Sequence, residues 1–304
     1  MKRWTNRARP RRSRLLLRVI GFALAIMQIA FTGSISIAQE GWLQQLRGEV
    51  DEPPTDPNAS TTTSAPPAKS KRRHHHDDCD DDDDDSFFGT MIGYGLTSPF
   101  WLPPAMIGDD YQQAMYFSPA PNMQSPGLMV TEEWVQSQAV TGFPWMARVR
   151  GEFGLDLDNL DQVRLQWLVD TSSRIGVDGT ITYRHESLAI GDDQAMTGDA
   201  NLLFRFAQSP TVQMRSGIGI NWFSDRTDAD VGFNFTYSGD FFLAKPWVVS
   251  SEIDWGTLGD SSLFHFRGTV GAVWRGLEVF TGYDHYGVDG LKTDQWISGL
   301  GFWF

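Results

Sequence analysis

Cysteine is almost absent from this chain of 304 residues, in which Cys79 is the single example. One thiol cannot close a disulfide within the chain, so the disulfide framework that stabilises many small exported domains is excluded. Cys79 also lies far from the N-terminus, which argues against attachment to a membrane as a lipoprotein.

Long hydrophobic runs are scarce as well. Beyond residue 38 no stretch reaches 18 consecutive apolar residues, so we expect no transmembrane helix there. A hydrocarbon layer accepts only helices and closed barrels, because other backbone structures leave polar groups unpaired. If this chain crosses a membrane, it therefore crosses as a β-barrel.

Positive charge is in short supply too. The chain has 25 Lys and Arg against 38 Asp and Glu, a formal net charge of −13. Residues 1–38 hold eight positive charges and no negative one, so the chain without them carries −21. Phosphate binding requires a basic surface, so this balance excludes nucleic acid as a partner.

The segment 1–38 predicts a secretory signal peptide. Residues 2–18 are basic, Val19 to Phe31 are apolar, and Ser36-Ile37-Ala38 supplies the small residues that a signal peptidase recognises. We therefore expect the protein to be exported.

Residues 39–86 predict a disordered linker that ends in an acidic tract. Residues 49–73 are rich in Pro, Thr, Ser and Ala and cannot form a core. In the tract 74–85, imidazoles suit Zn, Ni or Cu and carboxylates suit Ca or Mg, but no spacing fixes a geometry. We expect a solvated spacer, with at most weak divalent cation binding and no other cofactor. The candidate ligands are His74, His75, His76, Asp77 and Asp78.

The segment 87–144 combines many Pro, Met and aromatic residues with no sustained period. Three interpretations stay open: a cap over a barrel, a plug inside it, or an extra hairpin built from Met91 to Leu96 and Leu128 to Val135. The hairpin would raise the number of barrel strands.

Apolar and polar residues alternate from Trp145 to the end of the chain, which is typical of β-strands with one apolar and one polar face. Ten such strands, within a range of 8–12, fit into residues 145–304, and each is long enough to cross a bilayer. Tight periplasmic turns are expected at Gln208-Ser209-Pro210 and Arg275-Gly276, and the longest, external loop at Ser187 to Thr197. Trp and Tyr near the strand ends predict aromatic girdles at both membrane interfaces.

The last strand carries the most specific signal. Trp296, Ser298, Leu300, Phe302 and Phe304 lie on one face, and Ile297, Gly299, Gly301 and Trp303 lie on the other. This pattern resembles the closing strand of bacterial outer-membrane β-barrels. The resemblance implies outer-membrane lipid and the barrel-insertion machinery as partners, with Phe302 and Phe304 as part of the insertion signal.

On the membrane interpretation, charges of both signs face the lumen. They either form an ion-pair network that fills the barrel or line a narrow pore. The predicted lumen charges are Arg148, Arg150, Glu152, Arg164, Asp178, Arg184, Arg205, Arg215, Glu252, Asp254, Arg267, Glu278 and Asp284.

Catalysis has one weak candidate. Asp284-His285 beside Glu278 resembles the carboxylate and histidine pairs of ten-stranded outer-membrane proteases. Adjacent residues on a strand point to opposite faces, so Asp284 and His285 cannot share a site. We predict no catalytic residue.

The sequence as a whole predicts an all-β fold, an antiparallel up-and-down transmembrane β-barrel with a disordered N-terminal extension, located in the bacterial outer membrane. Its predicted role is a small pore or a structural surface barrel, not an enzyme. The alternatives are an exported soluble β-barrel or sandwich that binds a ligand and, third, a barrel-embedded hydrolase. No solute or oligomeric state is indicated.

Overall fold

A computed structural model describes residues 41–51, 97–156 and 160–304, apart from short gaps at 112, 119–120, 122–126, 139–140 and 190. The signal peptide, the tract 74–85 and the segment Met91 to Leu96 lie outside the described residues. No helix in the described part of the chain is long and apolar enough to span a membrane.

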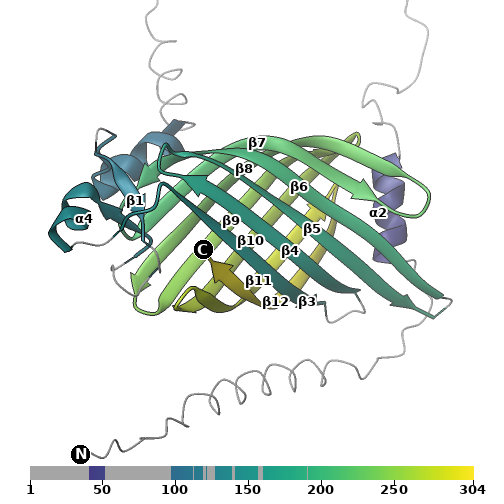
Figure 1. Ribbon diagram of the computed structural model, residues 1–304. Helices are drawn as coiled ribbons and strands as arrows, with labels where there is room; N and C mark the ends of the chain where they lie inside the picture. The colour runs from purple at the N-terminus through teal and green to yellow at the C-terminus, as the bar shows by residue number, and fades with distance from the viewer. Residues whose placement is uncertain are drawn as a thin grey trace, which may run out of the picture.

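Ten antiparallel strands form a closed barrel (Figure 1). Each strand pairs with its neighbours in sequence, and β12 pairs with β3 to close the wall. The predicted fold and the number of barrel strands are therefore confirmed. The strands are β3 (Trp145–Leu155), β4 (Leu160–Thr171), β5 (Ile175–Leu188), β6 (Gly191–Gln208), β7 (Val212–Ser224), β8 (Ala229–Ala244), β9 (Trp247–Leu258), β10 (Ser261–Trp274), β11 (Leu277–Val288) and β12 (Leu291–Trp303).

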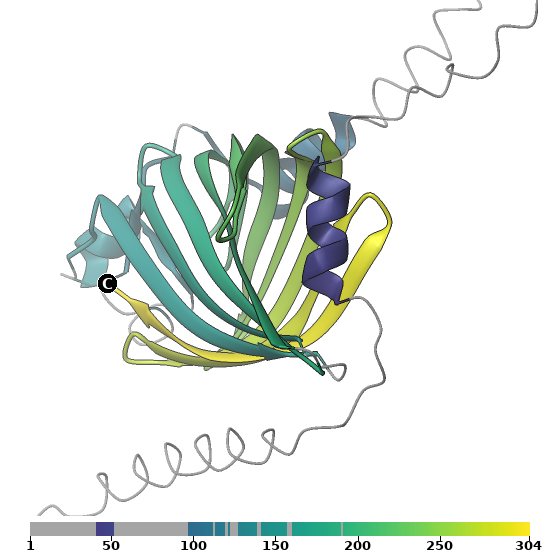
Figure 2. The ribbon, with the colours of Figure 1, turned by 90° about the vertical axis from the view of Figure 1, so that its right-hand side faces the viewer.

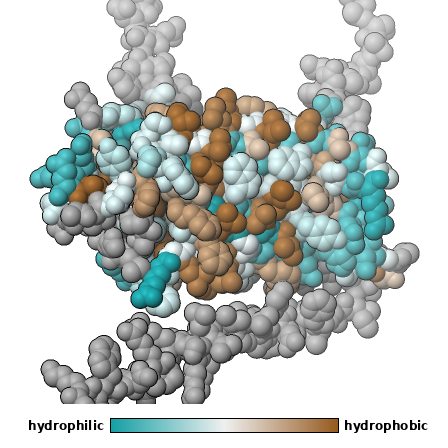
Figure 3. All heavy atoms as spheres, in the orientation of Figure 1, coloured by the Kyte–Doolittle hydropathy of each residue, from teal (hydrophilic) through white to brown (hydrophobic). Residues whose placement is uncertain are grey.

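The barrel is apolar outside and polar inside. On the outer wall, Ile218 is 58% exposed and Leu202 is 56% exposed, whereas the inward-facing Arg150 and Arg215 are each 1% exposed. Hydrophobic side chains gather over the middle of the wall and hydrophilic ones toward the two ends (Figure 3). A soluble barrel would have the opposite polarity, so this arrangement is that of a transmembrane β-barrel.

Exposed tryptophans mark both ends of the wall. Trp145 and Trp247 begin β3 and β9, and Trp274 ends β10, all at the end of the barrel where β12 finishes. Trp255 and Trp296 lie toward the opposite end. We name the end at which β3 begins and β12 ends the terminal mouth, and the opposite end the α2 mouth. The two groups have the positions of interfacial girdles.

Helix α2 (Trp42–Asp51) lies across the α2 mouth (Figure 2). This corrects the prediction that all of 39–86 is a disordered linker. Leu43, Leu46 and Val50 recur at helical spacing, and their shared face packs on apolar side chains at the barrel end, including Leu160 and Phe223. A short amphipathic pattern was hidden in a mainly polar segment.

The described residues between 109 and 144 cover the terminal mouth, so the cap is the interpretation that the structure supports. A helix at 97–107 precedes a separate two-stranded sheet of β1 (Met115–Phe117) and β2 (Met129–Thr131), and α4 (Glu132–Gln138) follows. Neither short strand joins the barrel. Leu128 to Val135 therefore contributes no barrel hairpin.

The prediction of a long external loop at Ser187 to Thr197 is wrong. Ser187 pairs with Asp192, and only residues 189–190 separate β5 from β6. The polar residues at this site belong to strands that continue past the apolar belt. The turn at Arg275-Gly276 is tight as expected, with positive φ at both residues, 56° and 80°, as a two-residue hairpin turn requires.

An arginine in the middle of the outer wall tests the membrane-facing polarity. We expect Ile218→Arg to lower the free energy of unfolding in lipid vesicles by about 2–4 kcal/mol, because the charge would lie in hydrocarbon. Val231→Arg, close to the α2 mouth, is the control and should cost about 0–1 kcal/mol. Denaturant titration measures both, and equal small effects would contradict a lipid-facing wall.

Candidate functional site: the charged lumen

The two-residue period of the strands places all the predicted lumen charges inside the barrel. Every one of them, from Arg148 on β3 to Asp284 on β11, is at most 8% exposed. Closure of the sheet brings these side chains together from strands that are far apart in sequence. The lumen is therefore the candidate functional site.

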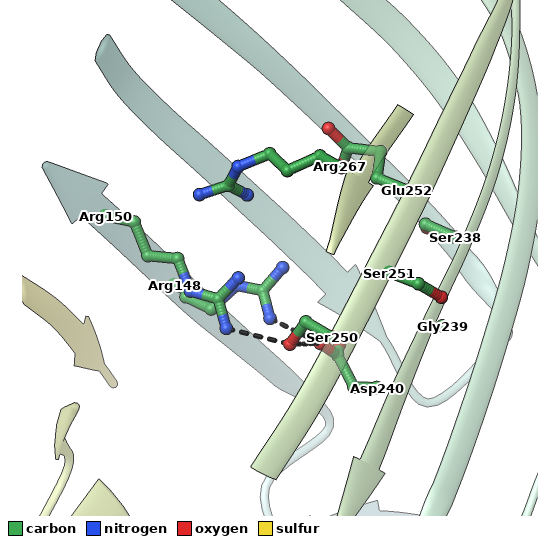
Figure 4. A pocket seen from close by; sticks show the side chains of 9 residues that line it. All are labelled: Arg148, Arg150, Ser238, Gly239, Asp240, Ser250, Ser251, Glu252 and Arg267. Atoms are coloured by element: carbon green, nitrogen blue, oxygen red, sulfur yellow. Dashed lines mark hydrogen bonds and ion pairs between the residues drawn. The ribbon is translucent and has the colours of Figure 1, made fainter. Parts of the chain in front are cut away.

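The first group of ion pairs lies near the terminal mouth, and Figure 4 shows two of its members, Arg148 and Asp240. Asp240 accepts from Arg148 at 2.7 Å and from Arg215 at 2.8 Å. Arg215 also contacts Asp170 at 2.7 Å, and Asp170 in turn pairs with Arg205 at 2.5 Å. Five buried groups on β3, β4, β6, β7 and β8 thus form one network across the barrel.

A second group closes the cross-section further in. The guanidinium of Arg150 binds Glu278 through two nitrogens, at 2.7 and 3.1 Å, and also donates to Ser250. Arg267 pairs with Glu152 and donates to Gln166 at 3.0 Å. These contacts join β3 and β4 to β9, β10 and β11, which are two to four strands away around the barrel, so side chains cross part of the lumen.

Toward the α2 mouth, Asp284 accepts from Arg164 at 2.9 Å. His265 lies beside this pair, with Nε2 2.8 Å from Asp284 and Nδ1 2.9 Å from Asp254. The sequence prediction did not include His265, nor Asp199 and Asp240. Each lies two residues from a polar inward position, so the same period of two could have identified them.

Two cavities in the lumen are small. One cavity beside Arg148, Asp240 and Glu252 has a volume of about 10 Å³, and another beside Asp199 and Tyr286 has about 20 Å³. A cavity needs at least about 10–15 Å³ of this kind to hold one water molecule. The two cavities therefore have room for water-sized molecules and not for an organic solute.

Helix α2 is held at its mouth by charge as well as by apolar contact. The carboxylate of Glu186 accepts from the backbone N–H of Trp42 at 2.6 Å and of Leu43 at 2.9 Å, which caps the positive end of the helix. Arg47 pairs with Asp193 at 2.6 Å and with Asp225. Burial raises the pKa of Asp225, but backbone N–H donors and Arg47 outweigh it and hold the pKa below its ordinary value.

The cap is fastened to the terminal mouth by one buried ion pair. Asp109 binds both terminal nitrogens of Arg174 at 2.7 Å and accepts from the backbone N–H of Gln208 at 2.9 Å. Apolar residues of the cap and the barrel share one cluster, which includes Phe117, Leu128, Met146 and Trp303. The cap is thus part of the folded barrel.

The helix at 97–107 lies on the outside of the wall. The ring of Phe100 packs 5.6 Å from Phe206 and 6.0 Å from Tyr237, measured between centroids, and Tyr237 donates to the carbonyl of Pro99. Trp101 and Met106 of the same helix are exposed. A helix with exposed apolar side chains beside the girdle has the character of an interfacial helix.

The remaining predicted residues do not converge on a site. Asp284 faces the lumen, whereas His285 lies on the outer wall, with Nδ1 2.5 Å from Asp294. Phe302 and Phe304 are exposed on the outer wall at the terminal mouth. His74 to Asp78 lie outside the described residues.

Removal of a shared counter-ion tests the network. Asp240→Asn removes the carboxylate that Arg148 and Arg215 share, while Arg215 keeps its contact with Asp170. Because a buried charge is then left without its counter-ion, we expect the free energy of unfolding to fall by about 3–5 kcal/mol. Asp294→Asn removes a carboxylate of the exposed outer wall and should cost about 0.2–1 kcal/mol. Denaturant titration of both refolded variants measures the difference, and similar losses would mean that the network is not a buried one.

Comparisons with known proteins give no family for this chain. No family model and no curated protein matches the chain. Among solved structures, the KdgM porin is 9% identical to this chain with a TM-score of 0.31. The alignment covers 51% of this chain and 98% of the porin chain. The protein Ail of Yersinia pestis is 13% identical with a TM-score of 0.30, covering 52% and 99%. The beta domain of the Bordetella autotransporter BrkA is 10% identical with a TM-score of 0.30, covering 53% and 98%.

Proposed function

We propose that this protein is a structural, non-conducting barrel of the bacterial outer membrane, without enzymatic activity. The observation that carries the proposal is the set of ion pairs between strands that are not neighbours, above all Arg148 of β3 with Asp240 of β8, which lie on opposite sides of the barrel, and Arg267 of β10 with Glu152 of β3. Such pairs occupy the cross-section that a pore would need to keep open. The charged lumen therefore acts as the core of the barrel.

Three features support the outer membrane as its location. The outer wall is apolar between two groups of tryptophan, the even number of strands brings both ends of the barrel to one mouth, and exposed Phe302 and Phe304 lie on or next to β12 at this mouth. The barrel-insertion machinery would read this last strand from the periplasm, and lipid would cover the wall. In this orientation the cap and the interfacial helix at 97–107 face the periplasm.

The alternatives have less support. An exported soluble barrel would expose its apolar wall to water, including Ile218, Ile220 and Phe233, which are each more than half exposed. A hydrolase would need a nucleophile or activated water beside its acid and base, but Asp284 is already paired with Arg164 and His265. The acidic tract 74–85 is still expected to be a solvated spacer, with at most weak divalent cation binding.

Conductance separates a filled barrel from a pore. We expect the purified full chain in a planar lipid bilayer to give no stepwise current, because paired side chains block the lumen. A variant with serine in place of Arg150, Glu278, Arg267, Glu152, Arg164 and Asp284 removes three bridges together and should give small conductance steps. The change in gel mobility on boiling verifies folding of both proteins. Stepwise current from the unchanged protein would favour the pore.

The connection between α2 and the cap restricts how the barrel can enter a bilayer. Residues 52–96 connect α2 at one mouth to the cap at the other, and they include Lys71 to Arg73 and Asp80 to Asp85. Such a segment cannot cross hydrocarbon outside the wall, and the lumen is occupied. We therefore expect α2 to leave its mouth when the barrel enters the membrane and to stay in the periplasm with the cap.

Cysteine labelling tests this arrangement in a Cys79→Ser background. Gly48→Cys on α2 and Ser137→Cys on α4 replace exposed residues, and no atom lies within 4 Å of the position of the new Cβ at Gly48. We expect an impermeant maleimide to label both positions only after the outer membrane is opened. Asp228→Cys, in the exposed turn at the α2 mouth, should react on intact cells.

Two other labelling results would contradict this arrangement. Labelling of Gly48→Cys on intact cells, with Ser137→Cys protected, would show that α2 stays in its mouth in the inserted barrel. Labelling of Ser137→Cys with protection of Asp228→Cys would show that the barrel has the reverse orientation.

A further inference from the structure

One arginine of the lumen differs from the others in having no carboxylate partner. In the described part of the chain, every buried arginine of the barrel except Arg184 forms an ion pair with an aspartate or a glutamate. The paired ones are Arg148, Arg150, Arg164, Arg174, Arg205, Arg215 and Arg267. Arg184 is 0% exposed and donates through Nη1 to the hydroxyl of Thr197, but its Nε and Nη2 have no hydrogen-bond partner.

The two free nitrogens of Arg184 lie on one edge of its guanidinium. Their N–H bonds point the same way and form the fork with which arginine binds an anion through two hydrogen bonds. The ring centroids of Tyr286 and Trp42 lie 4.3 and 5.8 Å from the guanidinium carbon, and both rings attract the charge. Neither ring is an anion, so this buried charge still lacks a counter-ion.

A cavity with further donors adjoins the guanidinium. Arg184 lines the cavity of about 20 Å³, together with Thr182 and Thr197, which lie opposite each other in the β5–β6 register. Thr182 accepts from Nε of Arg164 at 2.8 Å, and Thr197 accepts from Arg184, so the hydrogen of each hydroxyl is left to be donated. The cavity therefore combines donors from two strands with room for one ligand of about the size of a water molecule.

The carboxylates of Asp199 and Asp254 line the same cavity, but in the described part of the chain neither forms an ion pair with Arg184. Asp199 accepts from Thr180 and, at 2.9 Å, from Asn201. Thr180, opposite Asp199, is two inward-facing positions from Arg184 on the side away from the α2 mouth. The free donors thus lie toward the α2 mouth, and Asp199 lies deeper in the barrel.

We infer that Arg184 binds one small inorganic anion, such as chloride, in this cavity. Nε and Nη2 of Arg184 and the hydroxyls of Thr182 and Thr197 are its donors, and Trp42 of α2 packs over the guanidinium that holds it. The ion supplies the counter-charge that the other lumen arginines obtain from aspartate or glutamate. This site is independent of whether the barrel conducts.

The dependence of folding on chloride tests the site in the full chain, refolded in detergent. Chloride replaces gluconate at constant ionic strength, because gluconate is too large for the cavity, and urea is the denaturant because guanidinium chloride would itself supply the anion. Above the dissociation constant, we expect each tenfold rise in chloride to raise the folding equilibrium constant about tenfold, as one ion bound per folded chain requires. Arg184→Gln should abolish this dependence, and Thr197→Val should shift it to higher chloride.

Arg205→Gln is the matched control. Arg205 is also a fully buried lumen arginine whose guanidinium lies over a ring, 5.1 Å from the centroid of Phe117, but it pairs with Asp170. This variant should unfold at lower urea and keep the dependence on chloride of the wild-type chain, and the change in gel mobility on boiling verifies that every variant is folded.

Two results would overturn the site. Folding of the wild-type chain that does not depend on chloride would mean that the rings of Tyr286 and Trp42 alone compensate the charge of Arg184. An unchanged dependence in Arg184→Gln or, if that variant does not fold, in Thr197→Val would place the anion elsewhere.

Discussion

The barrel depends on one constraint: an ionised side chain in the lumen has to find its counter-charge on a different strand. Asp240 on β8 serves Arg148 on β3 and Arg215 on β7, and Glu278 on β11 serves Arg150 on β3. Arg148 and Asp240 are 92 residues apart in sequence and Arg150 and Glu278 are 128 apart, and neither pair lies on neighbouring strands, so these two bonds need the closed barrel. Lipid makes the outer wall tolerant of many apolar residues, whereas pairing makes the lumen specific.

Much of this arrangement could be predicted from the sequence because a strand has a period of two. The alternation from Trp145 onward gave the barrel, its ten strands and the sides on which the charges lie. It could not give the partners, since the shear of the barrel decides which inward residues meet at one level. The role of His265 between Asp254 and Asp284 depends on such a meeting of β9, β10 and β11.

The failures have physical causes as well. Ser187 to Thr197 resembled a loop because strands that rise beyond the membrane face water on both sides, and polarity then no longer distinguishes strand from loop. The sequence did not predict helix α2 because its apolar face has only three residues, Leu43, Leu46 and Val50, which is a weak signal. The apolar side chains of the barrel end on which they pack come from distant strands. The cap was one of three open possibilities, since its packing depends on contacts such as Asp109 with Arg174 that no periodicity encodes.

Charge is distributed unevenly along the lumen, and different bonds hold its parts together. Near the terminal mouth, arginines and carboxylates pair across the barrel, as Arg148 and Arg215 do with Asp240. In the middle of the lumen, the neutral amides of Asn201 and Asn234 donate to Asp178, Asp199 and Asp254. Ion pairs therefore join the wall near the terminal mouth, whereas neutral donors contribute many of the bonds in the middle, and a substitution of one charge should cost most where its partner is a buried arginine.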